Sequence, residues 1–201
     1  MGLTRERIVD AAYTVLDEQG LSGLSMRRVA QDLDVRPGAL YYHVANKQEL
    51  LAEVATRILG DGPTAPDARS AAGELRDALR RVRDGAEVVS FVLAFRPEGL
   101  APSRTFPELF ADRLGPRQAR WAARTLVHYV LGAVAEEQNR AELVRTGIVA
   151  DEPGHAVEAE EAFRFGLDAV LQGLESAPAL GPGGAGRDRG AERCGARAPG
   201  S

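Results

Sequence analysis

The sequence predicts an all-α fold, in which an N-terminal three-helix helix-turn-helix domain precedes a larger helical bundle. Apolar residues recur at three- and four-residue spacing along most of the chain, which is the period of an amphipathic helix. Asn, Asp, Ser, Gly and Pro residues stand between these segments, where helices begin and end. No segment alternates apolar and polar residues as a half-buried strand would, so no sheet is expected.

The first two helices are predicted from their caps and their apolar faces. The first runs from Thr4 to Gln19, with Thr4 as its N-cap and Gly20 as its stop. Ser25 is placed to cap a second short helix that ends near Asp34. The inward faces comprise Ile8, Ala11, Ala12, Val15 and Leu16 in the first helix, and Met26, Val29, Ala30 and Leu33 in the second.

Two more helices follow a tight connection. The third is predicted from Pro37 to about His43, because proline suits the first helical position, where its missing N–H would lack a partner anyway. Asn46 begins a variant of the capping box, which places the start of the fourth helix. The apolar stripe of that helix comprises Leu50, Leu51, Val54, Ala55, Ile58 and Leu59.

A domain boundary is expected near residue 60, where glycines and a proline interrupt the helical pattern. Residues 1–60 then form the helix-turn-helix domain, and residues 61–176 form a second helical domain. Residues 177–201 are rich in Gly, Ala, Pro and Arg, so this tail is expected to be disordered. Within the second domain, helices are predicted over 71–84, 85–95, 116–146 and 155–175, with a loop over 98–107.

Composition limits the classes of protein to which the chain can belong. The longest apolar stretches fall well short of the roughly 20 residues needed to cross a bilayer, and no signal-peptide pattern opens the chain. We therefore expect a cytoplasmic protein without a membrane partner. The single cysteine, Cys194, lies in the tail and can form no internal disulfide.

The sequence does not indicate catalytic chemistry. The three histidines, His43, His128 and His155, lie on three different predicted elements. No Ser-His-Asp order, Gly-rich phosphate loop or metal-ligand spacing accompanies them. We therefore expect no enzyme activity, no metal site and no cofactor.

The helix-turn-helix segment carries side chains that suit contact with DNA. Leu40 and Val44 can face inward together, but Tyr41, Tyr42 and His43 cannot all do so. Exposed aromatic rings and an imidazole beside basic residues suit phosphate and base-edge contacts, although the tyrosines could instead cap a small core. The formal net charge of −4 requires any basic face to be local. The neighbouring basic residues are Arg27, Arg28, Arg36 and Lys47.

Six short segments of this domain form a specific pattern. They are 8–12 (IVDAA), 18–21 (EQGL), 24–30 (LSMRRVA), 33–35 (LDV), 39–44 (ALYYHV) and 46–51 (NKQELL). With these segments in this order, residues 4–59 closely resemble the N-terminal domain of the TetR family of bacterial regulators. The resemblance implies an all-helical homodimer whose two recognition helices enter successive major grooves of a palindromic double-stranded DNA operator.

The resemblance also implies roles for individual residues. Arg27 and Arg36 would reach base edges or phosphates, with Arg28 beside them. Lys47 would anchor a phosphate at the N-terminus of the fourth helix, where the helix itself also attracts an anion. Pro37, Ala39, Tyr41, Tyr42 and His43 would line the recognition helix.

The resemblance continues to about residue 175. Residues 83–86 (RDGA), 96–97 (RP) and 131–138 (LGAVAEEQ) are similar to the tetracycline-repressor branch of the family, whose second domain encloses an effector pocket. Aromatic walls with a few polar groups are typical of small-ligand sites, although ordinary core packing is the alternative for each residue. The pocket would be built from Phe91, Phe95, Phe110, Trp121, His128 and Glu136, together with Phe106 and Tyr129.

The chain departs from the tetracycline-binding pattern of that branch. The histidine expected at the end of the fourth helix is replaced within 60–63, and the metal-coordinating histidine expected after Ala86 finds Glu87, Val88 and Val89. Glu136 does occupy the position of a carboxylate linked to the bound metal. These differences argue against Mg-dependent tetracycline binding and favour a different small-molecule effector that needs no metal.

The motifs and the resemblance together indicate a sequence-specific DNA-binding transcriptional regulator, expected to be a homodimeric repressor that a small-molecule ligand releases. A regulator of the same fold that activates transcription, or that acts without a ligand, is the alternative. Sequence does not separate the two, because promoter geometry decides the sign of regulation.

Overall fold

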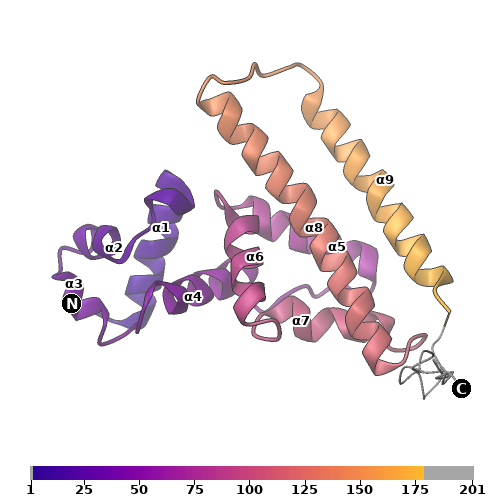
Figure 1. Cartoon of the computed structure of the whole chain (residues 1–201), viewed down its shortest axis with the longest axis horizontal. Helices are drawn as coiled ribbons and strands as arrows, with labels where there is room; N and C mark the ends of the chain where they lie inside the picture. Colours follow the sequence, from indigo (N-terminus) through magenta and orange to yellow (C-terminus); the bar gives the residue numbers. More distant parts are fainter. Residues whose placement is uncertain (1, 179–201) are drawn as a thin grey trace, which may run out of the picture.

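The computed structural model describes residues 2–178, and every regular element in this part of the chain is helical. Nine α-helices and one 3₁₀-helix follow one another over these residues (Figure 1), which confirms the predicted all-α fold. Each helix within residues 2–178 is too short or too polar to span a lipid bilayer. The predicted tail lies outside the described residues, apart from its first two positions.

The N-terminal domain begins its helices where the sequence predicted caps. The hydroxyls of Thr4 and Ser25 accept hydrogen bonds from backbone N–H groups three residues later, and the Asn46 amide oxygen accepts one in the same way. Each cap satisfies a donor that the first turn of a helix leaves free. The helices are α1 (Arg5–Gly23), α2 (Met26–Asp32), α3 (Pro37–Leu40) and α4 (Lys47–Leu59).

The recognition helix is shorter than predicted. α3 ends at Leu40, and residues 41–43 form a turn instead of continuing the helix to His43. Leu40 and Val44 are both fully buried, as predicted, and Asn46 already caps the next helix. The chain therefore has to change direction between Leu40 and Asn46, and this leaves no residues for α3 to continue to His43.

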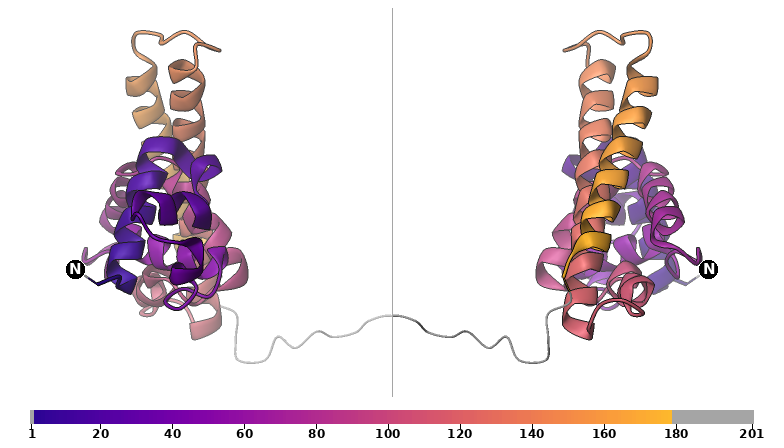
Figure 2. Two further views of the ribbon diagram at one scale, coloured as in Figure 1. Left: turned by 90° about the vertical axis from the view of Figure 1, so that its left-hand side faces the viewer. Right: turned by 90° about the vertical axis from the view of Figure 1, so that its right-hand side faces the viewer.

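The second domain is built around two long antiparallel helices that lie side by side and project beyond the others (Figures 1 and 2). The shorter helices pack against α8, and α4 of the N-terminal domain packs against α5 and α6. The elements are α5 (Ala68–Arg80), α6 (Gly85–Phe95), α7 (Ala101–Thr105), the 3₁₀-helix η1 (Phe106–Phe110), α8 (Pro116–Arg145) and α9 (His155–Ser176).

The predicted loop over 98–107 was wrong, because α7 and the start of η1 occupy much of it. Pro102 and Pro107 lie in the first turns of these two elements, where proline is tolerated, so they start helices here instead of breaking them. Phe106 is fully buried, which anchors the segment in the core. The helix predicted over 71–84 is α5, which starts earlier because Asp67 caps it and also ends earlier, at Arg80.

A buried arginine ties three helices of the second domain together. Arg76 of α5 is only 5% exposed, and its guanidinium lies 2.6 Å from Glu137 of α8 and 2.5 Å from Glu160 of α9. The same guanidinium is 4.0 Å from the ring centre of Phe163. The hydrogen bond from Arg76 lowers the pKa of the Glu160 carboxyl. The buried charge is thus paired on two sides, as burial of a charge requires.

Close packing of α8 against α9 depends on a glycine. Tyr129 of α8 donates a hydrogen bond to the Phe163 carbonyl at 2.7 Å, and its ring lies directly over Gly166. A Cβ atom at Gly166 would lie 2.8 Å from Cζ of this tyrosine, which is well inside van der Waals contact. The tyrosine cannot simply swing away, because its hydroxyl is held by the carbonyl.

We expect the substitution Gly166→Ala to lower the free energy of unfolding by about 1–3 kcal/mol, because the added methyl displaces Tyr129. Gly173→Ala is the matched control on the same helix, since nothing lies within 4 Å of its added Cβ atom. Helix propensity should make this control more stable by about 0.5–1 kcal/mol. Urea unfolding of both variants measures the difference, and equal stabilities would contradict this account of the packing.

Candidate nucleic-acid interface and effector cleft

The helix-turn-helix is held by backbone hydrogen bonds around one left-handed residue. Asp34 lies between α2 and α3 with φ of 52°, a conformation that aspartate tolerates better than most residues. The turn is closed by the Val35 N–H, which donates to the Ala30 carbonyl at 2.9 Å. α2 and α3 therefore meet at a fixed angle, as a helix-turn-helix requires.

The predicted recognition surface faces solvent. Tyr42 is 91% exposed and Tyr41 is 53% exposed, while Leu40 and Val44 beneath them are buried. Arg27, Arg36 and Pro37 are also exposed, and Ala39, His43 and Lys47 are half-buried at the same surface. The tyrosines therefore do not cap a core.

Arg28 is the predicted DNA-binding residue whose side chain is already engaged within the protein. Its guanidinium lies 3.0 Å and 3.3 Å from the amide oxygen of Gln19 in α1, with the amide oriented so that both groups are satisfied. This contact holds α2 against α1. It directs Arg28 toward the body of the domain, whereas Arg27 beside it is exposed.

Lys47 lies at the first position of α4, where backbone N–H groups and the lysine ammonium together attract an anion. The nearby carboxylate of Glu49 would oppose such an anion, but two arginines pair with it. Arg5 of α1 lies 2.9 Å from Glu49, and Arg96, directly after α6, lies 2.5 Å from it. The start of α4 is thus left electropositive, and α6 is tied to the N-terminal domain.

A second link joins the two domains at the other end of α6. Asp84 has a left-handed backbone with φ of 56°, and its carboxylate accepts the Leu21 N–H of α1 at 2.7 Å. Gly20 lies so close that a Cβ atom there would be 2.6 Å from Oδ2 of Asp84, and its own φ is +71°. Glycine is therefore required at this position on two counts.

Gln138 of α8 fixes the turn that carries Asp84. Its amide nitrogen donates to the Leu79 and Val82 carbonyls at 3.0 Å and 2.9 Å, and its amide oxygen accepts the Ala86 N–H at 3.2 Å. The Gln138 side chain thus hydrogen-bonds to backbone groups both at the end of α5 and at the start of α6. In the sequence, Gln138 stands out only as the last residue of the 131–138 segment. Its role in this turn cannot be predicted from the sequence, because all three hydrogen bonds join it to backbone groups at least 52 residues away in the chain.

A cleft of about 550 Å³ lies between α1, α6 and α8, next to this joint. Two predicted pocket residues, Phe91 and His128, line it. Phe95 lies one turn further along α6, where its ring packs edge-on against Phe91 at 5.4 Å between centroids. The other lining residues are Leu21, Asp84, Ala86, Glu87, Ser90, Leu131, Gly132, Ala135, Gln138 and Asn139.

The remaining predicted pocket residues do not line this cleft. Trp121 is 46% exposed on α8, with Arg117 stacked 4.6 Å from its ring centre, and Glu136 is exposed on the same helix. Phe110 packs partly buried beside the small cluster of Leu114, Ala119 and Ala122. Trp121 and Glu136 lie at different points along α8, and Phe110 lies in η1 before it, so these residues do not form one pocket with Phe91.

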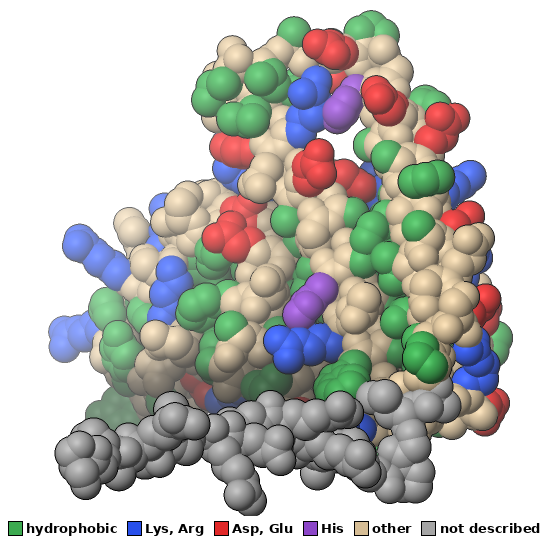
Figure 3. Space-filling view, turned by 45° about the vertical axis from the view of Figure 1, so that its right-hand side comes forward, with side chains coloured by type: hydrophobic (Ala, Val, Ile, Leu, Met, Phe, Trp, Pro, Cys, Tyr) green, Lys and Arg blue, Asp and Glu red, His purple; other side chains and the backbone are tan. Residues whose placement is uncertain are grey.

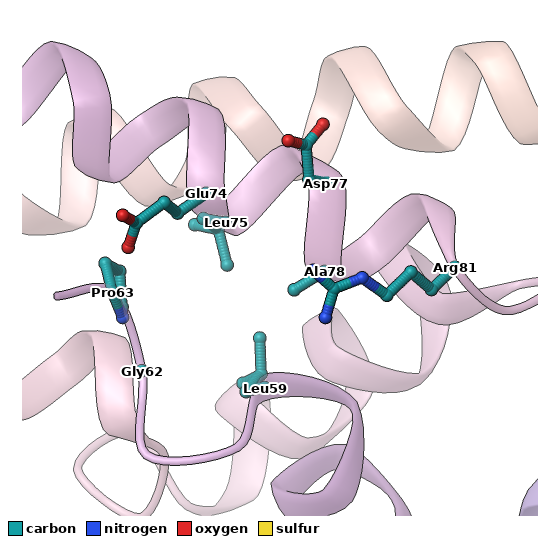
Figure 4. A pocket seen from close by; sticks show the side chains of 8 residues that line it. All are labelled: Leu59, Gly62, Pro63, Glu74, Leu75, Asp77, Ala78 and Arg81. Carbon is teal, nitrogen blue, oxygen red and sulfur yellow. The ribbon is translucent and has the colours of Figure 1, made fainter. Parts of the chain in front are cut away.

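A second, smaller cleft of about 320 Å³ lies where α4 leads into α5 (Figure 4). Leu59, Leu75 and Ala78 form apolar parts of its wall, and Glu74, Asp77 and Arg81 lie around it. The Glu74 carboxylate accepts the Thr64 N–H at 2.7 Å, so it already holds the connecting segment in place. We therefore interpret this cleft as part of the connection between α4 and α5, and we do not assign it a ligand.

The residues present do not fit a magnesium–tetracycline complex. Val88 and Val89, which stand where the resemblance expects a metal-coordinating imidazole, are fully buried apolar side chains. Among residues 2–178, no three His, Cys, Asp or Glu side chains are grouped so that they could hold a metal ion. Glu136 is exposed and has no imidazole partner at the expected position.

The fold and the exposed recognition surface define a helix-turn-helix DNA-binding regulator, and comparisons with known proteins give its family. The family model of bacterial regulatory proteins of the tetR family matches residues 8–54. The tetracycline repressor protein class D of Escherichia coli is 34% identical over 86% of this chain and 89% of that protein. The chain belongs to the TetR family and is a DNA-binding transcriptional regulator.

Solved structures are similar over both domains. The structure of BioQ with its natural double-stranded DNA operator is 35% identical and covers 88% of this chain and 100% of that one, with a TM-score of 0.69. A TetR variant from Acinetobacter baumannii in complex with minocycline is 32% identical and covers 87% and 97%, also with a TM-score of 0.69. The similarity therefore includes the second domain as well as the helix-turn-helix.

We expect Asp84→Ala to lower the free energy of unfolding by about 2 kcal/mol, because it leaves the Leu21 N–H without its acceptor and puts alanine at positive φ. Asp84→Asn should retain most of the stability, since asparagine keeps an oxygen acceptor and tolerates the left-handed region. Urea unfolding of the two variants distinguishes them. Equal losses would show that the hydrogen bond does not hold the joint.

Proposed function

We propose that the chain is a homodimeric repressor that binds a palindromic operator and that a small molecule releases. The observation that carries the proposal is the exposure of Tyr41 and Tyr42 beside the electropositive start of α4. A core-forming role would bury these rings. The similar BioQ structure contains operator DNA, which supports the same use of this surface here.

The DNA contacts divide into positioning and reading groups. Lys47 and the N-terminus of α4 suit a phosphate, and Arg27 and Arg36 lie within the same exposed surface. Pro37, Ala39, Tyr41, Tyr42 and His43 project from the short α3 and the turn after it, which is the part of the domain that a major groove admits. Arg28 positions α2 through Gln19.

The dimer is proposed to form through the outer faces of α8 and α9. These helices lie together at one side of the molecule (Figure 2), where apolar side chains are interspersed with charged ones (Figure 3). Phe165 is 79% exposed, Val157 63% and Trp121 46%, which is unusual for large apolar groups in a single chain. A second copy that covers this face would bury them and would place two recognition surfaces on one DNA duplex.

The cleft between α1, α6 and α8 is the proposed effector site. Its volume lies within the range of small-molecule sites, and it combines an apolar wall at Phe91 and Leu131 with a few polar groups. It contacts both domains, since Leu21 belongs to α1. The minocycline complex of the TetR variant supports a ligand-responsive second domain, although this chain lacks the residues for a metal-bound tetracycline.

Selection of bound fragments from random double-stranded DNA with the purified protein tests the operator proposal, and a palindromic consensus is expected. On that consensus, Tyr42→Ala should weaken binding roughly tenfold, and Lys47→Ala should also reduce the salt slope by about one. Arg104→Ala removes a charge from α7 and serves as the control that should bind normally. Normal operator affinity in both test variants would disprove the assigned recognition surface.

The dimer interface is tested by Phe165→Glu, which should shift the protein to a monomer in sedimentation experiments because a carboxylate would be buried in an apolar contact. Ile148→Glu is the control, because Ile148 is 70% exposed in the connection after α8 and outside the proposed helix faces. The monomeric variant should also lose operator affinity. A wild-type chain that sediments as a monomer at micromolar concentration would overturn the interface.

A further inference from the structure

The cleft between α1, α6 and α8 is acidic. Asp84 and Glu87 are the carboxylates among its twelve lining residues, and none of the twelve is Lys or Arg. His128 is the one lining residue that could become positively charged. The guanidinium groups of Arg83 and Arg145 lie near Asp84 and partly offset its charge, whereas no cationic side chain in the described residues pairs with Glu87. The cleft therefore attracts cations and disfavours anions mainly through Glu87.

Glu87 is the carboxylate that is free to meet a ligand. Asp84 already accepts the Leu21 N–H, whereas Glu87 forms no hydrogen bond or ion pair with any residue in the described range. Glu87 lies in the first turn of α6, and Phe91 follows four residues later on the same face. Phe91 is 44% exposed, and its ring packs against the ring of Phe95.

We infer that the cleft binds a small organic cation with a flat apolar body, in which the cationic nitrogen pairs with Glu87. The body lies against Phe91 and Leu131, and the Phe91 ring face adds a cation–π contribution. Ser90 and Asn139 supply oxygen atoms that accept further N–H bonds from the ligand. This inference rests on the proposed ligand response and gives its effector a chemical class.

The location of the cleft connects this ligand to operator release. Its lining includes Leu21 and Asp84, the two partners of the hydrogen bond between the domains. A cationic nitrogen between the two carboxylates attracts Asp84 as well as Glu87, and so competes with the Leu21 N–H for Oδ2. The ligand therefore favours the arrangement in which that bond is broken.

The test uses three probes with one aromatic body and different head groups: naphthylmethylamine, naphthylmethanol and naphthylacetate. Calorimetric titration of the full-length dimer should show the amine binding roughly tenfold more tightly than the alcohol or the carboxylate, because only the amine forms a charge-assisted hydrogen bond with Glu87. Glu87→Gln should abolish the preference for the amine. Glu108→Gln is the matched control, since Glu108 is an exposed carboxylate of η1 outside the cleft.

Glu87 is exposed, so its replacement by glutamine should not unfold the protein, and a retained melting temperature checks this. The inference is overturned if the amine binds no better than the alcohol, or if its preference survives in Glu87→Gln. Operator affinity is measured on the same samples without any probe. If the unsubstituted protein binds the operator normally but shows no preference for the amine, the ligand class is overturned and the proposed regulator stands. Absent operator binding by the unsubstituted protein overturns the proposed function.

Discussion

The contact of α1 with the second domain is built around a partly buried joint, in which Gln138 fixes the turn that presents Asp84 to α1. The four hydrogen bonds of Gln138 and Asp84 in this joint all use a backbone group: the Leu79 and Val82 carbonyls, and the N–H groups of Leu21 and Ala86. The polar side-chain atoms of Gln138 and Asp84 therefore cannot be removed without leaving these backbone groups unpaired.

α6 is consequently attached to the DNA-binding domain at both ends. Its N-terminal end carries Asp84, which bonds to α1, and its C-terminal end leads to Arg96, which pairs with Glu49 of α4. Glu49 lies two residues after Lys47, the proposed phosphate anchor. A displacement of α6 thus acts on the orientation of α1 and on the charge at the start of α4 together, although none of the proposed DNA-contacting residues lies on α6 itself.

Local signals in the sequence predicted the helices well, and the differences have physical causes. Caps such as Thr4, Ser25 and Asn46 are read directly, because the capping group and its partner are three residues apart. The helical character of 101–110 was missed because prolines were read as breakers when they occupy first turns. The candidate pocket was predicted from its aromatic residues, and this identified Phe91. It did not identify Glu87, four residues earlier in the same helix, because only the packing of α1 and α8 beside α6 shows that this face of the helix lines a cleft.

A ligand can shift a regulator only by the difference between its affinities for the two arrangements of the protein, so the lining of a site matters more than its volume. A pocket enclosed within the second domain would have to pass its effect through intervening helices. A ligand in the proposed effector cleft would act without such intervening helices, because Leu21 and Asp84 are part of the cleft wall. In a symmetric dimer the same change occurs in both subunits. Recognition of two half-sites about 34 Å apart makes operator binding sensitive to small reorientations of each domain. A ligand that makes few contacts is then enough to release the operator, provided that these contacts disturb the Leu21–Asp84 hydrogen bond.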